Sequence, residues 1–349
     1  MKKTVFTAYV ALLLSLLMPL AGRALPASEK SEAPPVSAAP SPPAHTPTAE
    51  IAPGPIAGED GPDTPPPTEG AAPLTIRLLT EETVLELPLE EYLTGVLAAE
   101  MPASYPMEAL KAQAVAARTY ALYCADSGKH SQADVCADPG CCQAWQNEEA
   151  MESRWGADFE ANRARLRQAV SETEGQILLY EGRPVFAAFH ASSPGRTEDC
   201  GQVWNPRPYL VSVSSPETEE TVPGLESSLR CEALDFRDTI LSAYPQADFS
   251  APPEDWLGQA EYDESGRVAE LSVGGLPLRG TELRSLFHLR SAAFSLRFEE
   301  GAFVFTVLGS GHGVGMSQVG ARLMAEGGAD YREILNHYYT ATELSCISG

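Results

Sequence analysis

The pattern of apolar and polar positions is most informative between Pro88 and Pro102. At 100° per residue, a helix over this stretch places five apolar side chains on one stripe: Leu89, Tyr92, Leu93, Val96 and Leu97. Glu100 falls about 20° from Leu89, inside the stripe that should meet the core. Pro102 disfavours helical dihedrals at the residue before it, so the helix should end near Glu100. The pattern therefore predicts a carboxylate at the buried end of a helix.

Two effects disfavour the charged form of a carboxyl in that position. Burial removes its hydration, and the C-terminal end of a helix dipole is negative. The pKa of Glu100 should therefore be raised, and a carboxylic acid that stays protonated near neutral pH suits general-acid catalysis. The structural alternative is that Glu100 reaches past the core to an arginine, or that the helix is rotated and leaves it exposed.

The remaining folded part mixes strand and helix patterns in no regular order. Alternating patterns predict strands at 75–79, 83–87, 176–180, 184–190, 261–262, 268–273, 294–298 and 303–308. The strands 176–180 and 184–190 should form a hairpin that turns at Glu181-Gly182. Patterns of three and four predict helices at 107–124, 148–154 and 159–173, and helical and irregular structure from 225 to 256. This order favours an α+β fold, with mixed helices and short antiparallel strands, over a doubly wound sheet.

The first 73 residues differ in composition from the rest. Lys2 and Lys3 precede an uncharged, largely apolar run over residues 4–22. Residues 1–24 are therefore predicted to be a signal peptide or an N-terminal membrane anchor, and either would place the rest of the chain outside the cytoplasm. Residues 25–73 hold 14 of the 29 prolines without apolar periodicity, which predicts a disordered, proline-rich stalk. Residues 74–349 form the predicted folded domain.

The charge of the folded part excludes one class of partner. Of the formal net charge of −24, residues 1–24 contribute +3 and residues 25–73 contribute −6, which leaves −21 for residues 74–349. So acidic a domain lacks the basic surface of a nucleic-acid-binding protein. Its partner should be neutral or carry cations of its own.

One loop carries residues with the chemistry of a metal site. His130, Cys136, Cys141 and Cys142 lie within 13 residues, among Asp, Gly and Pro. These residue types suit tetrahedral zinc, and the spacing lets His130, Cys136 and either or both of Cys141 and Cys142 converge. Disulfides are the alternative in an exported chain. The pattern indicates no role for the other cysteines, which are Cys124, Cys200, Cys231 and Cys346.

Two polar loops are candidates for ligand binding. The first follows a predicted strand and carries His190, Ser192 and Ser193, and the aromatic residues Trp204 and Tyr209 after it could form a wall for a sugar ring. Ordinary turn chemistry and loop packing are the alternatives. The second loop, residues 309–321, runs through alternating glycines into a helix, where His312 and Gln318 could point into a ligand. A tight buried turn with a satisfied histidine is the alternative, and no lysine follows the glycines as in a phosphate-binding loop.

Three stretches together resemble the stage II sporulation protein D family, also called the SpoIID/LytB domain. They are Leu89-Glu-Glu-Tyr-Leu through Ala99-Glu100-Met-Pro, then Leu110-Lys-Ala-Gln-Ala-Val-Ala-Ala-Arg-Thr-Tyr120, and Gly311-His-Gly-Val-Gly-Met-Ser-Gln318. The similarity extends over about residues 74–344 and implies one cleft-bearing domain. It implies a peptidoglycan lytic transglycosylase that cleaves glycan strands between N-acetylmuramic acid and N-acetylglucosamine in sporulation. The glutamate before Met-Pro, here Glu100, would be the catalytic acid.

The resemblance also assigns roles to the loops. Phe189 to Glu198 and Trp204 to Leu210 look like the family's intervening segment. Together with the loop patterns, we predict substrate binding by His190, Ser192, Ser193, Tyr209, His312 and Gln318. The family's metal loop is similar to His130, Cys136 and Cys142, which implies a structural zinc. Cys141 stands where a histidine is expected, so the part it takes stays open. An amidase or endopeptidase of the engulfment machinery is the implied protein partner.

Two other functions remain compatible with these motifs. The first is a non-catalytic wall-binding module that enhances a partner amidase. The second is a secreted metalloenzyme that uses His190, His312 and the cysteines. Loss of chemistry before loss of fold on metal removal would identify the metalloenzyme.

Overall fold

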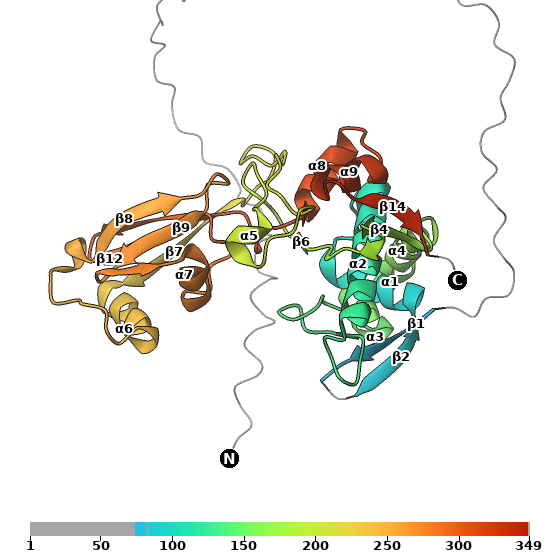
Figure 1. Ribbon diagram of the computed structural model, residues 1–349, viewed down its shortest axis with the longest axis horizontal. Coiled ribbons are helices and arrows are strands. Elements are labelled where there is room, and N and C mark those ends of the chain that lie inside the picture. Colours follow the sequence, from blue (N-terminus) through green and yellow to red (C-terminus); the bar gives the residue numbers. More distant parts are fainter. Residues whose placement is uncertain (1–73, 82, 348–349) are drawn as a thin grey trace, which may run out of the picture. The chain divides into compact units, whose positions relative to one another are not determined.

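A computed structural model of the chain describes residues 74–81 and 83–347. The predicted leader or anchor and the predicted stalk lie outside these residues. The described part mixes helices with short, mostly antiparallel sheets, so the α+β class is confirmed (Figure 1). None of its helices is both long and apolar enough to span a bilayer.

The elements follow the chain in three groups. The first contains β1 (Thr75–Leu79), β2 (Val84–Pro88), α1 (Leu89–Glu100), α2 (Met107–Ser127), β3 (Val135–Cys136), α3 (Glu148–Trp155), α4 (Phe159–Ser171), β4 (Gln176–Tyr180), β5 (Arg183–Pro184), β6 (Phe189–His190) and α5 (Cys200–Val203). The second contains β7 (Glu226–Glu232), α6 (Ala233–Ala243), β8 (Leu257–Tyr262), β9 (Val268–Val273), β10 (Leu276–Leu278), α7 (Gly280–Leu286), β11 (Phe294–Glu299) and β12 (Ala302–Leu308). The third contains β13 (Met316–Ser317), α8 (Gln318–Glu326), α9 (Tyr331–Tyr338) and β14 (Glu343–Cys346). Short 3₁₀ turns lie at Gly156–Asp158 and Pro253–Asp255.

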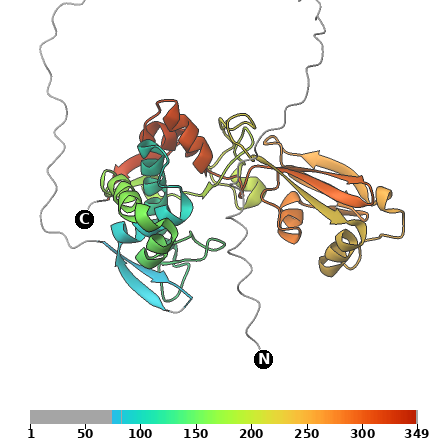
Figure 2. The same ribbon diagram turned by 180° about the vertical axis from the view of Figure 1, so that it is seen from behind.

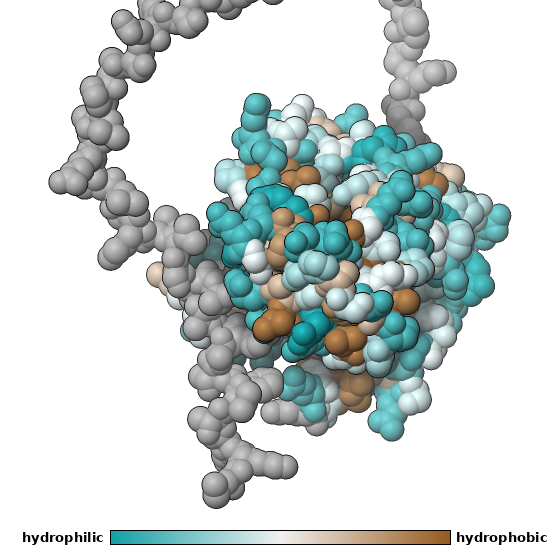
Figure 3. All heavy atoms as spheres, turned by 90° about the vertical axis from the view of Figure 1, so that its left-hand side faces the viewer, coloured by the Kyte–Doolittle hydropathy of each residue, from teal (hydrophilic) through white to brown (hydrophobic). Residues whose placement is uncertain are grey.

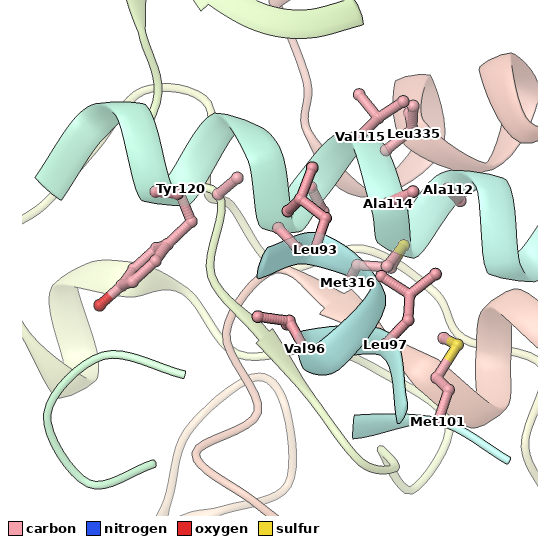
Figure 4. Packing of buried hydrophobic residues seen from close by; sticks show 14 of the residues in the cluster. Leu93, Val96, Leu97, Met101, Ala112, Ala114, Val115, Tyr120, Met316 and Leu335 are labelled. Atoms are coloured by element: carbon pink, nitrogen blue, oxygen red, sulfur yellow. The ribbon is translucent and has the colours of Figure 1, made fainter. Parts of the chain in front are cut away.

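A first hydrophobic core surrounds α1 and α2. The predicted stripe of α1 is fully buried in it, and Leu93 points towards α2 (Figure 4). The many alanines of α2 let other elements approach it closely, and α8 and α9 lie beside it in both ribbon views (Figures 1 and 2). Met316 and Leu335, from the C-terminal group, complete this core. The two ends of the folded chain are thereby joined around one helix.

A second hydrophobic core belongs to residues 226–308. Its centre is a stack of aromatic rings, in which the Phe236 ring centroid lies 4.0 Å from that of Phe303. Two three-stranded antiparallel sheets carry it, with strand orders β11-β12-β7 and β10-β9-β8. The chain enters and leaves this segment at one place, because Gly309 N–H donates to the Leu225 carbonyl at 2.9 Å and Leu308 pairs with Glu226. Residues 226–308 are therefore an insertion between the first and third groups.

Two of the predicted segments differ in the structure. The hairpin partner of β4 ends at Pro184, and residues 189–190 pair instead with β13 in parallel. The segment 225–256 begins with a strand, β7, before its helix. The β7 strand shows no clear apolar alternation because most of its side chains are exposed, so no strand pattern was visible.

The surface shown in Figure 3 is mostly hydrophilic, with hydrophobic side chains scattered between polar ones. In the insertion the exposed large apolar residues are Leu229, Leu234 and Tyr262, which lie on three different elements. Scattered apolar residues of this kind are normal on a soluble surface.

Candidate functional site

Glu100 is the last residue of α1. The next residue, Met101, has an extended backbone with φ −127°, as expected before Pro102. The carboxylate is largely buried and accepts two hydrogen bonds, from Ala144 N–H at 2.9 Å and from Gln318 Nε2 at 3.3 Å. Burial raises the pKa of Glu100, and the two hydrogen bonds oppose that rise. The direction agrees with the sequence prediction, and no second carboxylate contributes to it.

The loop that carries Ala144 is fixed on α1 by close packing. The Trp145 indole lies against Gly95, where any β-carbon would overlap the ring, and Gln146 N–H donates to the Gly95 carbonyl at 3.2 Å. The buried Gln143 donates to the Tyr92 hydroxyl at 2.8 Å and to the Ala117 carbonyl at 3.2 Å. The loop therefore contacts both α1 and α2, and this holds the Ala144 N–H towards Glu100.

The same loop begins with the predicted metal residues. The ligand atoms of His130, Cys136, Cys141 and Cys142 lie within 4.8 Å of one another. His130 Nε2 is 3.3 Å from Cys142 Sγ and 3.8 Å from Cys141 Sγ. Tetrahedral zinc with one nitrogen and three sulfur ligands needs separations of about 3.4–3.8 Å. The two His130 distances lie close to this range, the donor set of all four residues suits such an ion, and Cys141 lies with the three predicted ligands. The seven cysteines, all among the described residues, form no disulfide.

Gln318 reaches Glu100 from the C-terminal part of the chain. It is the first residue of α8, and Ser317 caps the helix by accepting from Gly320 N–H. The short strand β13 before it pairs in parallel with β6, with Ser317 opposite His190. The predicted loops after β6 and around 309–321 are therefore adjacent, and the second supplies a direct contact to Glu100.

His190 and Ser193 form a buried polar pair behind this contact. His190 Nδ1 donates to the Val314 carbonyl at 3.2 Å, and this leaves Nε2 to accept from the Ser193 hydroxyl at 2.6 Å. Burial lowers the pKa of His190 well below its usual value, which keeps the ring neutral. Glu217 ties the pair to α8, because its Oε1 accepts from Ser193 N–H at 3.0 Å and from the Ser317 hydroxyl. Glu217 has no motif around it, and nothing in the sequence pointed to it.

Two other predicted residues are also buried. Ser192 N–H donates to the Ser310 carbonyl at 3.0 Å, and this contact joins the two loops. The Tyr209 hydroxyl accepts from Phe186 N–H at 3.1 Å, and its ring packs on Tyr180. Neither residue contacts Glu100 directly. Their predicted contact with substrate stays a prediction, as does that of His190 and Ser193.

His312 lies beside an exposed aromatic ring. Its ring centroid is 4.7 Å from that of Trp204, which is 41% exposed and among the most exposed large apolar side chains of the described residues. His312 Nδ1 accepts from Val314 N–H at 3.1 Å, and burial lowers the pKa of His312 to about 4. The two ring planes are inclined at 55°, so the exposed Trp204 indole alone offers a flat face on which a sugar ring could stack, with the neutral imidazole beside it.

Residues of the insertion extend the polar network. The Arg267 guanidinium packs against Gly313, which has φ +86°, and donates to the Ser193 hydroxyl at 3.3 Å. Its Nε lies 3.9 Å from Glu198 Oε2, and both side chains are almost fully buried. Burial, with Asp263 nearby, raises the pKa of Glu198 to about 7. The glycine pattern predicted close backbone approach, but at Gly313 the approaching group is an arginine of this chain.

Comparisons with known proteins agree with the motifs. A family model described as stage II sporulation protein matches residues 80–180. The chain is 34% identical to the stage II sporulation protein D of Bacillus amyloliquefaciens, over 80% of this chain and 81% of that protein. It is 33% identical to the stage II sporulation protein D of Bacillus subtilis, over 79% of this chain and 80% of that protein. The amidase enhancer of Bacillus subtilis is 27% identical over 72% of this chain and 40% of that protein.

Proposed function

The chain belongs to the stage II sporulation protein D family, and we propose that it is a peptidoglycan lytic transglycosylase with Glu100 as its single acid and base. The substrate would be glycan strands of alternating N-acetylmuramic acid and N-acetylglucosamine. The observation that carries the proposal is the environment of Glu100: burial raises the pKa of its carboxyl, whose hydrogen-bond donors among the described residues are the Ala144 N–H and the Gln318 amide.

The proposed reaction needs one carboxyl group. Protonated Glu100 donates its proton to the glycosidic oxygen, the bond from C1 of the muramyl ring to that oxygen breaks, and positive charge develops at C1. The Glu100 carboxylate then accepts the proton of the muramyl 6-hydroxyl, whose oxygen bonds to C1. The products are a 1,6-anhydro end and a free 4-hydroxyl end, and no water is consumed. A hydrolase would need a second carboxylate at a defined separation.

The hydrogen bonds to Glu100 suit both halves of this cycle. The Ala144 N–H and the Gln318 amide can stabilise the carboxylate that forms after the first proton transfer. Burial raises the proton affinity of the carboxylate, which makes it a stronger base in the second step. The exposed Trp204 indole, beside His312, would hold a neighbouring sugar ring by stacking.

The metal site would stabilise the loop that carries Ala144. His130, Cys136, Cys141 and Cys142 would hold zinc, which would supply folding stability to the loop when bound. The loop continues directly into Gln143 and Ala144, which contact α1, α2 and Glu100. We therefore assign the site a structural part in placing the Ala144 N–H.

The cellular location of the protein is also part of the proposal. The apolar run in residues 4–22 after two lysines supports an extracytoplasmic location, either membrane-anchored or secreted to the cell wall. A part in sporulation, with an amidase as partner, fits the names of the related proteins. Cell-wall remodelling in engulfment, and an endopeptidase as an alternative partner, belong to the proposal through the family resemblance.

The test is the release of anhydro-ended fragments from peptide-free glycan strands by the purified full chain, measured by mass spectrometry. Wild-type protein should release them, and Glu100→Gln should lower the rate by a factor of about 10²–10⁴ or more. Glu91→Gln, on the exposed side of the same helix, is the matched control and should keep the wild-type rate. Full activity of Glu100→Gln would remove the assignment.

A wall-binding enhancer of an amidase is the second candidate, favoured by the similarity to the amidase enhancer. It predicts that wild-type protein and Glu100→Gln bind glycan equally, that neither releases fragments, and that both raise the activity of an added amidase. The same experiment with and without the amidase separates the two functions.

A further inference from the structure

A small cavity lies next to His312, beyond the residues that contact Glu100. It is bordered by Glu198 and Gln202 on one side and by Arg267, Arg279 and Arg284 of the insertion on the other. Its volume is about 30 Å³, whereas a water molecule needs roughly 10–15 Å³ on the same scale. The cavity can therefore accept a substituent of two or three heavy atoms, but not a sugar ring.

Three guanidinium groups face this space in a domain that is otherwise strongly acidic. The Arg267 side chain is 2% exposed, and its Nε has no hydrogen-bond partner among the described residues. Arg284 donates only through Nε, to the Leu289 carbonyl at 3.3 Å. Arg279 donates to the Gln202 carbonyl at 2.8 Å. Among the described residues Arg267 has only the long ion pair of 3.9 Å with Glu198, and Arg279 and Arg284 have none, so the three positive charges face few carboxylates.

The carboxylates of the cavity are already occupied by other groups. Glu198 accepts from Ser265 at 2.9 Å and from Asp199 N–H at 2.8 Å. Asp263 accepts from Ser265 and from Arg267 N–H, both within its own turn. Burial lowers the pKa of Arg267 and of Arg284; at Arg267 the nearby Glu198 and Asp263 oppose that fall, whereas at Arg284 no carboxylate does. Near neutral pH Glu198 is partly protonated, since its pKa is raised to about 7, and this adds to the positive excess.

The cavity is placed where a bound glycan could reach it. His312 borders the cavity and its ring also contacts that of Trp204, with the two planes inclined at 55°. A ring that stacks on the exposed Trp204 could direct a short substituent past His312 towards Arg284. Muramyl residues carry such a substituent, a lactyl ether that ends in a carboxyl group, whereas N-acetylglucosamine has none. The carboxyl is free and charged once no peptide is attached to it.

We propose that the cavity lined by Arg267, Arg279 and Arg284 binds the free lactyl carboxylate of a muramyl residue. The inference rests on the proposed function, since it assigns a specificity determinant to the same glycan site. Arg284 is the primary contact, because its guanidinium has the fewest hydrogen-bond partners. Arg267 contributes its unpaired Nε. An arginine fork matches a carboxylate in both shape and charge.

The experiment compares two substrates that differ only in this charge. One is peptide-free glycan, and the other is the same glycan after conversion of its muramyl carboxyls to neutral methylamides. Wild-type full-length protein should have a KM about 10- to 100-fold higher on the neutral glycan, the usual cost of a lost charged hydrogen bond. Arg284→Gln should show a similar rise on the charged glycan and little difference between the two substrates. Arg284→Lys should recover part of the preference.

Arg297→Gln is the matched control, since Arg297 is an exposed arginine of the insertion that pairs with Glu299 and lies outside the cavity. It should keep the wild-type preference. Equal KM values of wild-type protein on both glycans would overturn the inference, as would an Arg284→Gln variant that loses affinity for both to the same extent. Circular dichroism verifies the fold of each variant, and Arg279→Gln serves as a second test if Arg284→Gln does not fold.

A binding measurement separates this inference from the proposed function. Glu100→Gln is mixed with each glycan, and the dissociation constants are compared. Tighter binding of the charged glycan without cleavage by wild-type protein would retain the carboxylate site and reject the transglycosylase. Cleavage of both glycans with no preference in binding or KM would retain the transglycosylase and reject the carboxylate site.

Discussion

The backbone N–H of Ala144 donates a hydrogen bond of 2.9 Å to Oε1 of Glu100. Ala144 comes two residues after Cys142, a member of the His/Cys cluster. The polar end of α1 is therefore joined, through one short loop, to a group of side chains suited to bind zinc. This relationship gives each of the two sites a measurable effect on the other.

The pH dependence of glycan cleavage should follow the raised pKa of Glu100. Only the protonated carboxyl can donate to the glycosidic oxygen, so kcat/KM should fall as the pH rises through that pKa. Gln318→Leu removes a hydrogen bond that favours the carboxylate, so the pKa should rise further and the descending limb should move to higher pH. A limb that moves to lower pH in this variant would contradict the account.

Glu100→Gln should also change stability in a pH-dependent way. Because burial raises the folded-state pKa, the ionised carboxylate costs stability at any pH above that pKa. The cost disappears as the pH falls below the unfolded value of about 4.5. The variant should therefore unfold at a higher denaturant concentration than wild type at pH 7, and the difference should vanish near pH 4. A difference that is constant with pH would show that titration of Glu100 is not its cause.

Loss of the His/Cys cluster should reduce stability before it affects chemistry. Cys136→Ala removes a buried member of the cluster, and we expect a loss of about 3 kcal/mol or more, equivalent to a melting temperature lower by roughly 6–12 °C. Chelation of the metal should act in the same direction. Cys346→Ala is the control, since its exposed thiol lies outside the cluster and should change stability by less than about 0.5 kcal/mol. Activity lost on chelation at unchanged melting temperature would favour the metalloenzyme instead.

A substitution in α1 at Gly95, which contacts Trp145, should displace the loop that carries Ala144. Gly95→Ala places a methyl group where the indole lies, and overpacking of this kind costs about 1–3 kcal/mol. The Ala144 hydrogen bond should lengthen or break, and the alkaline limb of the pH profile should then move upward, as for Gln318→Leu. Unfolding in denaturant and the pH profile test the two effects separately. Glu91→Ala, an exposed change in the same helix, should leave both unchanged.

The sequence predicted those features whose signal is local. The position of Glu100 followed from helical spacing over twelve residues, and the metal residues lie within thirteen. Gln318 was predicted from its glycine loop, although its contact with a glutamate 218 residues earlier could not be predicted. The α+β class followed from the order of the patterns.

The parts that were missed depend on partners far along the chain. Glu217 contacts Ser317 at a separation of 100 residues, and Arg267 contacts Ser193 at a separation of 74, with no motif around either residue. The strand β7 is polar on most positions and is defined by its partner β12. Helix α7 has seven residues, too few for a periodic pattern.

The adjoining ends of residues 226–308 have an evolutionary consequence. Because the Gly309 N–H donates to the Leu225 carbonyl, a short connection could replace the whole segment, with loss of the Arg267 contacts to Ser193 and Gly313. All three arginines of the proposed carboxylate site belong to that segment. The proposed preference for one kind of glycan would then be gained or lost with this insertion in a single genetic event, while Glu100 and its hydrogen-bond donors stay in the chain.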